Sequence, residues 1–256
     1  MKFAIEVFGQ LRLWEIQSSL PKLKSFLIEN GFEVDTYGTF WNDDYALNLF
    51  NNKKLSFFDK LNLIDEPPFE YGTLKKYYYN LKHSTQQRKE TNKYYDIILQ
   101  CRSDLNFALD NKAVKLLEEF KTLILDNQDT PTTFINEMTT WRGKDLKPPG
   151  FKLDDRHFWS NEKGANMIGS TYDEFIKLET PVVNIREGIF CYHNFHKVID
   201  HFNINTIFLD KMFSCANLMR WDILKKLNLR DSELSKHIQD YKSLLEYYES
   251  SNLRTS

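Results

Sequence analysis

Arg102 and Asp104 stand two residues apart in the stretch YDIILQCRSDLNF, directly after an apolar run. The run over 94–100 predicts a buried strand, so both charges fall where that strand ends. A guanidinium at this position can bind a phosphate through two hydrogen bonds, and a carboxylate can hold a ribose hydroxyl or a divalent cation. The alternative is an ion pair between the two side chains, which at a surface contributes only about 0–1 kcal/mol.

Similar groups follow the first predicted strand, FAIEVF at 3–8. Gly9 comes directly after it, and Gln10 and Arg12 follow. A glycine lets the backbone approach a ligand closely, while the amide and the guanidinium can bind phosphate oxygens. Each residue also has an ordinary explanation, because a glycine after a strand is usually a turn and Arg12 could form a salt bridge on a helix face.

The second predicted strand, FEVDTYGTFW at 32–41, ends in Trp41 and is followed by Asn42-Asp43-Asp44. The indole ring could stack on a base, and the carboxylates could bind a ribose or a cation. In open α/β sheets, ligands bind beyond the carboxyl ends of the strands. We therefore expect the polar groups that follow all three strands to share one edge of a sheet.

Two further acids, Asp154 and Asp155, precede a helix expected near 164–178. A carboxylate beside a reacting carbon can act as a general base. Alternatively, the pair caps the following helix, a role that stabilises a helix by about 1 kcal/mol and needs no substrate. His193 is a candidate metal or phosphate ligand, although no acid or cysteine has the spacing of a zinc site.

The elements that would position these groups alternate along the first half of the chain. A helix begins at Ser18 or Ser19 and ends at Gly31, and another spans about 73–91. Strands and helices in alternation are typical of a mostly parallel sheet flanked by helices, the α/β class. The remaining expectations are an irregular segment at 55–70, a helix at 112–120, a strand at 122–126, a loop at 127–150, a helix at 186–200, a strand at 204–209 and an amphipathic helix at 232–248.

Composition narrows the class of protein. The chain has 256 residues and a formal net charge of −2, so its overall charge does not favour binding to nucleic acid. Three widely spaced cysteines fit a reducing compartment. No apolar segment reaches the roughly 18–20 residues that span a bilayer. We expect one cytoplasmic domain over 1–256, with a core over about 1–210 and a helical extension over about 211–256.

The helix expected at 73–93 is basic, with Glu90 as its single acid and three tyrosines at 77–79. Such a helix could contact an anionic membrane surface peripherally, where lipid-linked molecules reside. The alternative is a solvated outer helix. Its basic residues are Lys75, Lys76, Lys82, Arg88, Lys89 and Lys93.

Five segments in order resemble a group of bacterial and viral glycosyltransferases associated with surface polysaccharide and lipopolysaccharide synthesis. The segments are VFGQLR, VDTYGTFWND, YDIILQCRSDLNF, DDRHFWSN and REGIFCYHNF, and the resemblance spans roughly residues 2–210. The chain departs from the group at three places. The group often has arginine at Gln100, often proline at Ser103, and commonly an amide where Arg156-His157 stands.

The resemblance implies a GT-A-like fold and a hexosyltransferase-like enzyme that moves a sugar from a nucleotide-sugar donor to a glycan or glycolipid acceptor. By this resemblance Arg102 and Arg12 contact the donor phosphates, and Asp104 holds Mn²⁺, Mg²⁺ or the ribose. Asp155 acts as the base, with Asp154 as substitute or helper. Two other functions stay open: a metal-dependent phosphoesterase, and a non-catalytic nucleotide- or glycan-binding protein.

Overall fold

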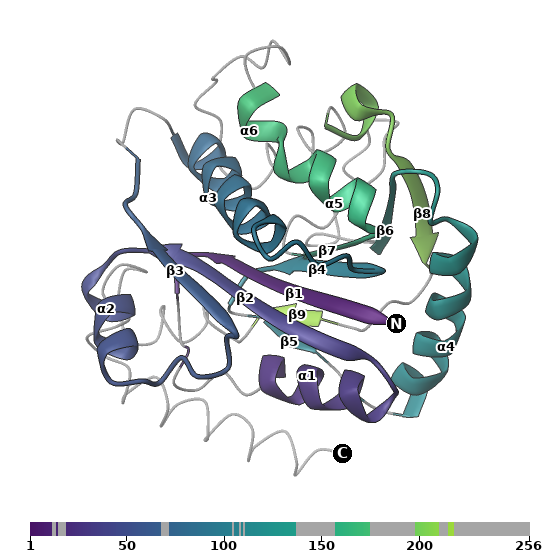
Figure 1. Cartoon of the computed structure of the whole chain (residues 1–256), viewed down its shortest axis with the longest axis horizontal. Coiled ribbons are helices and arrows are strands. Elements are labelled where there is room, and N and C mark those ends of the chain that lie inside the picture. Colours follow the sequence, from purple (N-terminus) through teal and green to yellow (C-terminus); the bar gives the residue numbers. More distant parts are fainter. Residues whose placement is uncertain are drawn as a thin grey trace, which may run out of the picture.

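A seven-stranded sheet forms the centre of the computed structural model, in the order β3-β2-β1-β4-β7-β6-β8 (Figure 1). The strands are β1 (Lys2–Gly9), β2 (Glu33–Trp41), β3 (Lys60–Ile64), β4 (Ile97–Cys101), β6 (Thr132–Asn136), β7 (His157–Ser160) and β8 (Asn205–Leu209). The structure describes residues 1–11, 14, 19–67, 72–103, 105–107, 109, 111–136, 157–174, 198–209 and 215–217.

Most neighbouring strands run parallel. β1 pairs in parallel with both β2 and β4, β2 with β3, and β6 with β8. β7 is antiparallel to both β4 and β6. A second, two-stranded antiparallel sheet joins β5 (Leu105–Phe107) to β9 (Cys215–Asn217). The expected architecture, a mostly parallel central sheet flanked by helices, is confirmed.

Helices cover both faces of the sheet (Figure 1). One face carries α1 (Ser19–Glu29) and α4 (Asn111–Asp126), which pack with Phe3, Ile5 and Val7 of β1. The other carries α3 (Gly72–Lys89), α5 (Glu162–Gly169) and the short α6 (Thr171–Glu174). Because both faces are covered, β1 is an almost continuous apolar run rather than an alternating one.

The first half of the chain follows its local signals closely. α1 ends just before Gly31, whose φ of 85° few other residues adopt without strain. Two elements there were not expected. Asp43 caps α2 (Asp44–Asn51), accepting a hydrogen bond from the Ala46 amide, and the 55–70 segment contains β3. β3 is a half-exposed edge strand, so its sequence lacks the apolar run that marks a central one.

The second half corrects several expectations. The predicted strand at 122–126 is wrong, because α4 continues to Asp126 and Ala113, Leu117, Phe120 and Ile124 form one buried helical stripe. The 127–150 segment, expected as a loop, contains β6, and β7 was not anticipated. Both strands are short and are held by their neighbours in the sheet, β7 by β4 and β6, and β6 by β7 and β8.

The predicted helix at 164–178 is present as α5 and α6, and the strand at 204–209 as β8. The predicted helix at 186–200 lies mostly outside the described residues, with helical backbone at 198–202. The C-terminal helix at 232–248 lies wholly outside them.

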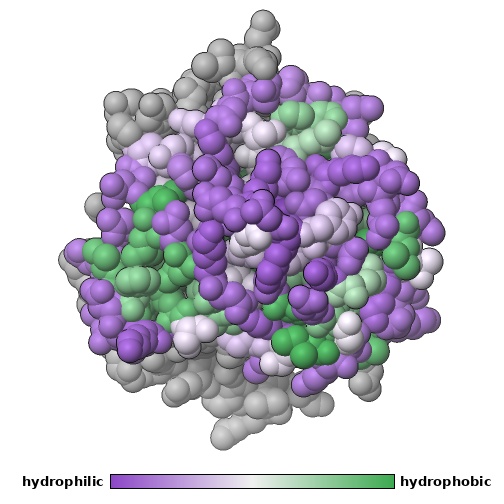
Figure 2. All heavy atoms as spheres, in the orientation of Figure 1, coloured by the Kyte–Doolittle hydropathy of each residue, from purple (hydrophilic) through white to green (hydrophobic). Residues whose placement is uncertain are grey.

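The surface on the side viewed in Figure 1 is mainly hydrophilic across its centre (Figure 2). Apolar residues gather instead on the side where α2 and β3 lie and toward α1 and α4. The large apolar side chains exposed on these helices are Ile28, Leu47, Phe50, Val114 and Leu125.

Candidate functional site at the carboxyl edge of the sheet

The topology places a switch point between β1 and β4. From β1 the chain crosses to β2 through α1 on one face, and it reaches β4 through α3 on the opposite face. The two connections therefore diverge where the carboxyl ends of β1 and β4 meet. In open α/β sheets this is where a crevice for a ligand forms.

Gly9, Gln10, Arg102 and Ser103 flank this switch point. Val7 pairs with Cys101, so Gly9 is level with Ser103 on the neighbouring strand. The buried Ser103 hydroxyl donates a hydrogen bond of 3.1 Å to the Gln10 carbonyl and ties the two strand ends together. Arg102, half-buried, is the next residue after β4. The structure thus brings together the ends of the first and third predicted strands.

Gly9 adopts a φ of 103°, and a methyl group on its Cα would meet no atom of the described residues within 4 Å. Among those residues, the backbone at the end of β1 is therefore uncovered at this point. The Gly9 amide donates a hydrogen bond of 3.0 Å to the Oδ1 atom of Asn80 on α3. This amide is therefore already engaged, which limits the expected role of Gly9 to providing close approach.

Asn80 was not identified as a site residue from the sequence. Its side chain is fully buried. It lies between Tyr78 and Leu81, which are both buried against the sheet. A polar residue within the apolar face of a helix was the signal that could have identified it, because a buried amide needs partners.

Trp41 lies at the end of β2, half-buried. Its ring is nearly parallel to that of Tyr79 on α3, at an angle of 16° and a centroid distance of 6.4 Å. Tyr79 in turn meets Tyr172 of α6 edge to face, at 5.1 Å. Trp41 therefore belongs to a row of aromatic rings that runs from the sheet edge over α3.

The polar residues after Trp41 have structural partners. Asn42 donates a hydrogen bond of 3.1 Å to the Asp65 carboxylate, which links the chain after β2 to that after β3. Asp43 is the N-cap of α2. These contacts explain both side chains without a ligand.

A charged group lies beside the aromatic row. Lys82 forms an ion pair of 2.5 Å with Asp173, and its ammonium lies 5.4 Å from the centre of the Tyr172 ring. Partial burial, with the positive charge of Lys82, lowers the pKa of His83 below its ordinary value of 6.5, although Asp173 acts in the opposite direction. His83 contacts the Tyr79 ring at 4.6 Å.

The positions of β7 and α5 test the interpretation of Asp154 and Asp155, which precede β7 in the sequence, as a helix cap. His157, its first residue, pairs with Cys101, the last residue of β4, so β7 begins at the edge where β4 ends. The N-cap of α5 is Asn161, whose side chain accepts a hydrogen bond from the Gly164 amide. The alternative interpretation of Asp154 and Asp155 as the cap of the following helix is therefore wrong.

Gln100, where the resembling group often has arginine, is hydrogen-bonded to residues of the protein's own interior. It is fully buried on β4 and donates hydrogen bonds to Glu6, at 2.9 Å, and to Thr85, at 3.1 Å. The cation beside Glu6 is Arg88 of α3. Burial alone would lower the pKa of Arg88, but the carboxylates of Glu6 and Glu162 raise it.

Five predicted site residues lie outside the described residues. They are Arg12, Asp104, Asp154, Asp155 and His193. Among the residues that are described, no three histidine, cysteine or acidic side chains gather as a metal site would require. Asp104 and His193, the proposed metal ligands, lie outside those residues.

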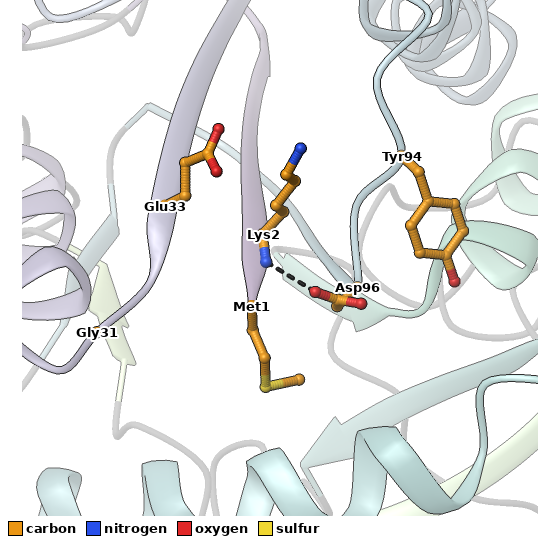
Figure 3. Close-up of a pocket in the computed structure, with 6 residues that line it drawn as sticks. All are labelled: Met1, Lys2, Gly31, Glu33, Tyr94 and Asp96. Atoms are coloured by element: carbon orange, nitrogen blue, oxygen red, sulfur yellow. Dashed lines mark hydrogen bonds between the residues drawn. The ribbon is translucent and has the colours of Figure 1, made fainter.

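A hollow of about 580 Å³ lies at the opposite end of the strands, beside the start of β1 (Figure 3). Its lining residues are Met1, Lys2, Gly31, Glu33, Tyr94 and Asp96. The Lys2 amide donates a hydrogen bond of 2.7 Å to the Asp96 carboxylate. This hollow lies at the amino ends of β1, β2 and β4, away from the switch point.

The basic residues expected on the outer face of α3 are largely paired. Lys76 pairs with Glu66 at 2.9 Å and Lys82 with Asp173, while Arg88 is buried. These contacts favour the structural explanation of the helix's charge. Within the described part of the chain, no helix has the length and apolar character needed to cross a bilayer.

No protein-family model matches the sequence, and no curated protein matches it. Solved structures with a similar arrangement include one from Desulfovibrio desulfuricans assigned as a nucleotide-diphospho-sugar transferase. It has 11% identity and a TM-score of 0.45, over 96% of this chain and 97% of that one.

Two further solved structures are glycosyltransferases or carry a nucleotide. A glycosyltransferase involved in glycosylation of the major capsid of PBCV-1 has 10% identity and a TM-score of 0.40, over 93% of this chain and 90% of that one. S. aureus TarS in complex with UDP has 10% identity and a TM-score of 0.36, over 67% of this chain and 55% of that one.

Proposed function

We propose that this chain is a glycosyltransferase that moves a sugar from a nucleotide-sugar donor to a glycan or glycolipid acceptor. The observation that carries the proposal is the switch point between β1 and β4. There the Ser103–Gln10 hydrogen bond holds together the strand ends that bear Gly9 and Arg102. The five ordered segments of sequence support the same reading, including a GT-A-like fold and a role in surface polysaccharide synthesis.

The proposed role of Arg102 follows from the chemistry of the leaving group. When the glycosidic bond to the donor breaks, the nucleoside diphosphate gains negative charge. Donors and cations placed in advance on its oxygens stabilise that charge in the transition state. Arg102 stands where β4 ends, and we assign it, with Arg12, to the diphosphate.

Asp104 is proposed to hold the ribose or a divalent cation, with His193 as a further candidate ligand. When bound, Mn²⁺ or Mg²⁺ would neutralise charge on the diphosphate. Asp104 follows Arg102 by two residues in the sequence, so the two belong to the same strand end. This assignment rests on the sequence, since both proposed ligands lie outside the described residues.

Asp155 is proposed as the base that takes the proton of the acceptor hydroxyl, with Asp154 as helper. The register supports this, because Asp155 precedes His157 by two residues and His157 lies at the edge of the switch point. In an inverting reaction the reacting carbon is oxocarbenium-like in the transition state, and a carboxylate base opposite the leaving group activates the attacking oxygen.

The test is thermal unfolding with UDP, GDP, CMP and their sugar conjugates, each with and without Mn²⁺, on wild type and Asp104→Asn. A ligand at 100 times its dissociation constant adds about 2.7 kcal/mol to the free energy of unfolding. In a domain of this size the midpoint should rise by roughly 5–10 °C. Asp129→Asn, an exposed acid beyond the site, is the matched control.

A rise with one nucleotide class that weakens in Asp104→Asn but not in Asp129→Asn would support the proposal. Hydrolysis of simple phosphate esters with metal, and without a sugar nucleotide, would instead indicate a phosphoesterase. Binding of a nucleotide or glycan without turnover of any donor would indicate a non-catalytic binding protein.

A further inference from the structure

The side-chain amide of Asn80 is satisfied at one end only. Its Oδ1 atom accepts the hydrogen bond from the Gly9 amide, which fixes the orientation of the group because a backbone N–H cannot donate to an NH₂. Its Nδ2 atom is buried and has no hydrogen-bond partner within the described structure. An amide NH₂ offers two donors, so both stand unused in the interior.

The unused donors lie at the switch point. The Oδ1 and Nδ2 atoms share one amide, so Nδ2 lies within a few ångströms of the Gly9 backbone at the end of β1. Alternation along β4 predicts that Arg102 lies on the same face as Gln100, the face that α3 covers. The donors of Asn80 and the guanidinium of Arg102 thus belong to the same side of the sheet, at neighbouring strand ends.

An unpaired buried NH₂ is costly, and a native structure normally avoids it. The cost is recovered when a ligand supplies the missing acceptor. A neutral donor on the same side of the sheet as an arginine suits an anionic oxygen, and phosphate oxygens offer several lone pairs to such a site. A nucleobase carbonyl is less well suited, because it offers the guanidinium no charge to pair with.

We propose that Asn80 binds a phosphate oxygen of the nucleoside diphosphate through its Nδ2 atom while its Oδ1 atom holds the Gly9 turn. This inference rests on the proposed function, and it adds a residue of α3 to the donor site. Asn80 thereby couples the position of the β1 end to the presence of the ligand.

The decisive variant is Asn80→Asp. An aspartate keeps an acceptor for the Gly9 amide, but it replaces the donor with a group that repels phosphate. A hydrogen bond to a charged group lost in this way weakens binding of UDP, or of whichever nucleoside diphosphate wild type binds, by roughly ten- to a hundred-fold. The affinity of Asn80→Asp for inorganic pyrophosphate should fall to a similar extent, because the proposed contact is with a phosphate oxygen.

Ser84→Ala is the matched control. Ser84 lies one turn further along α3, is fully buried, and its hydroxyl likewise has no partner within the described structure. Removing this hydroxyl should leave the affinity for nucleotide and for pyrophosphate unchanged. Titration calorimetry on the full chain measures all three proteins.

A second measurement does not depend on the variant folding. In wild type labelled with ¹⁵N-asparagine, the two Asn80 NH₂ proton signals should move downfield when the nucleotide is added. Equal affinities of wild type and Asn80→Asp, or an unmoved Asn80 signal with nucleotide bound, would overturn the role of Asn80 alone. If the weakening appears with the nucleotide but not with pyrophosphate, the phosphate assignment is wrong. Absence of any nucleotide binding by wild type would overturn the proposed function and this inference together.

Discussion

Arg88 of α3 forms an ion pair with Glu6 in the middle of β1, and both side chains are fully buried. The guanidinium also pairs with Glu162 and donates a hydrogen bond of 2.8 Å to Asn166, both on α5. One cation thereby joins the central strand to two helices on the face that also carries Asn80. Gln100 also donates a hydrogen bond of 2.9 Å to the Glu6 carboxylate.

Replacing Arg88 with methionine should destabilise the protein by about 3–5 kcal/mol, because it leaves buried carboxylates without a counter-charge. Chemical denaturation followed by circular dichroism measures this change. In the double variant with Glu6→Gln, the loss should be smaller than the sum of the single losses, by roughly 0.5–3 kcal/mol. The exposed Lys89→Met is the control. An equal loss of unfolding free energy in Lys89→Met would show that the buried Arg88–Glu6 pair makes no particular contribution to stability.

Gly164 lies on α5 against the backbone of β6. A methyl group on its Cα would stand 2.5 Å from the carbonyl oxygen of Thr132, so a main-chain atom would have to move. Alanine normally stabilises a helix interior by up to about 1 kcal/mol relative to glycine. Here we expect Gly164→Ala to destabilise by about 1–3 kcal/mol instead.

Urea denaturation of Gly164→Ala, compared with the exposed neighbour Lys163→Ala, tests whether the free energy of unfolding falls rather than rises. The control should change the free energy of unfolding by less than about 0.5 kcal/mol. A stabilised Gly164→Ala would mean that α5 does not approach β6 as closely as described.

His83 should make stability fall on mild acidification. Its pKa is lowered in the folded protein, chiefly by burial and then by Lys82, so the unfolded chain takes up a proton that the folded one resists. The free energy of unfolding therefore decreases as the pH drops through the unfolded value of about 6.5.

Melting temperatures of wild type and His83→Gln between pH 8 and pH 5 give the comparison. Wild type should lose more stability than the variant over this range, since glutamine does not titrate. Parallel curves for wild type and His83→Gln would show that His83 has the same pKa in the folded and the unfolded chain.

Asp155→Asn should lower the turnover number of the transferase by roughly 10²–10⁴-fold if Asp155 is the base. Nucleotide affinity and melting temperature should stay close to wild type, because the proposed role concerns the acceptor proton. Asp154→Asn, the proposed helper, should lose far less, and the exposed Asp129→Asn is the matched control that should keep wild-type turnover. An equal loss in Asp154→Asn and Asp155→Asn, or none in Asp155→Asn, would refute the assignment.

Sequence alone determined the central elements of the fold. The strands at 3–8, 32–41 and 94–100 and the helices α1 and α3 follow from apolar runs, a glycine stop and helical periodicity. These signals are local, since each depends on residues within a few turns or strand positions of one another. The shared edge of the first and third strands was predicted in the same way, because carboxyl ends of parallel strands meet.

Only the tertiary structure decided what each polar side chain does. Asn80 meets Gly9 across 71 residues and Arg88 meets Glu6 across 82. β7 lies between β4 and β6 in the sheet. Such partners are set by how α3 and α5 pack on the sheet, and no spacing in the chain encodes a contact between residues so far apart. The physical reason is that a buried polar group takes whichever partner the packed core brings to it.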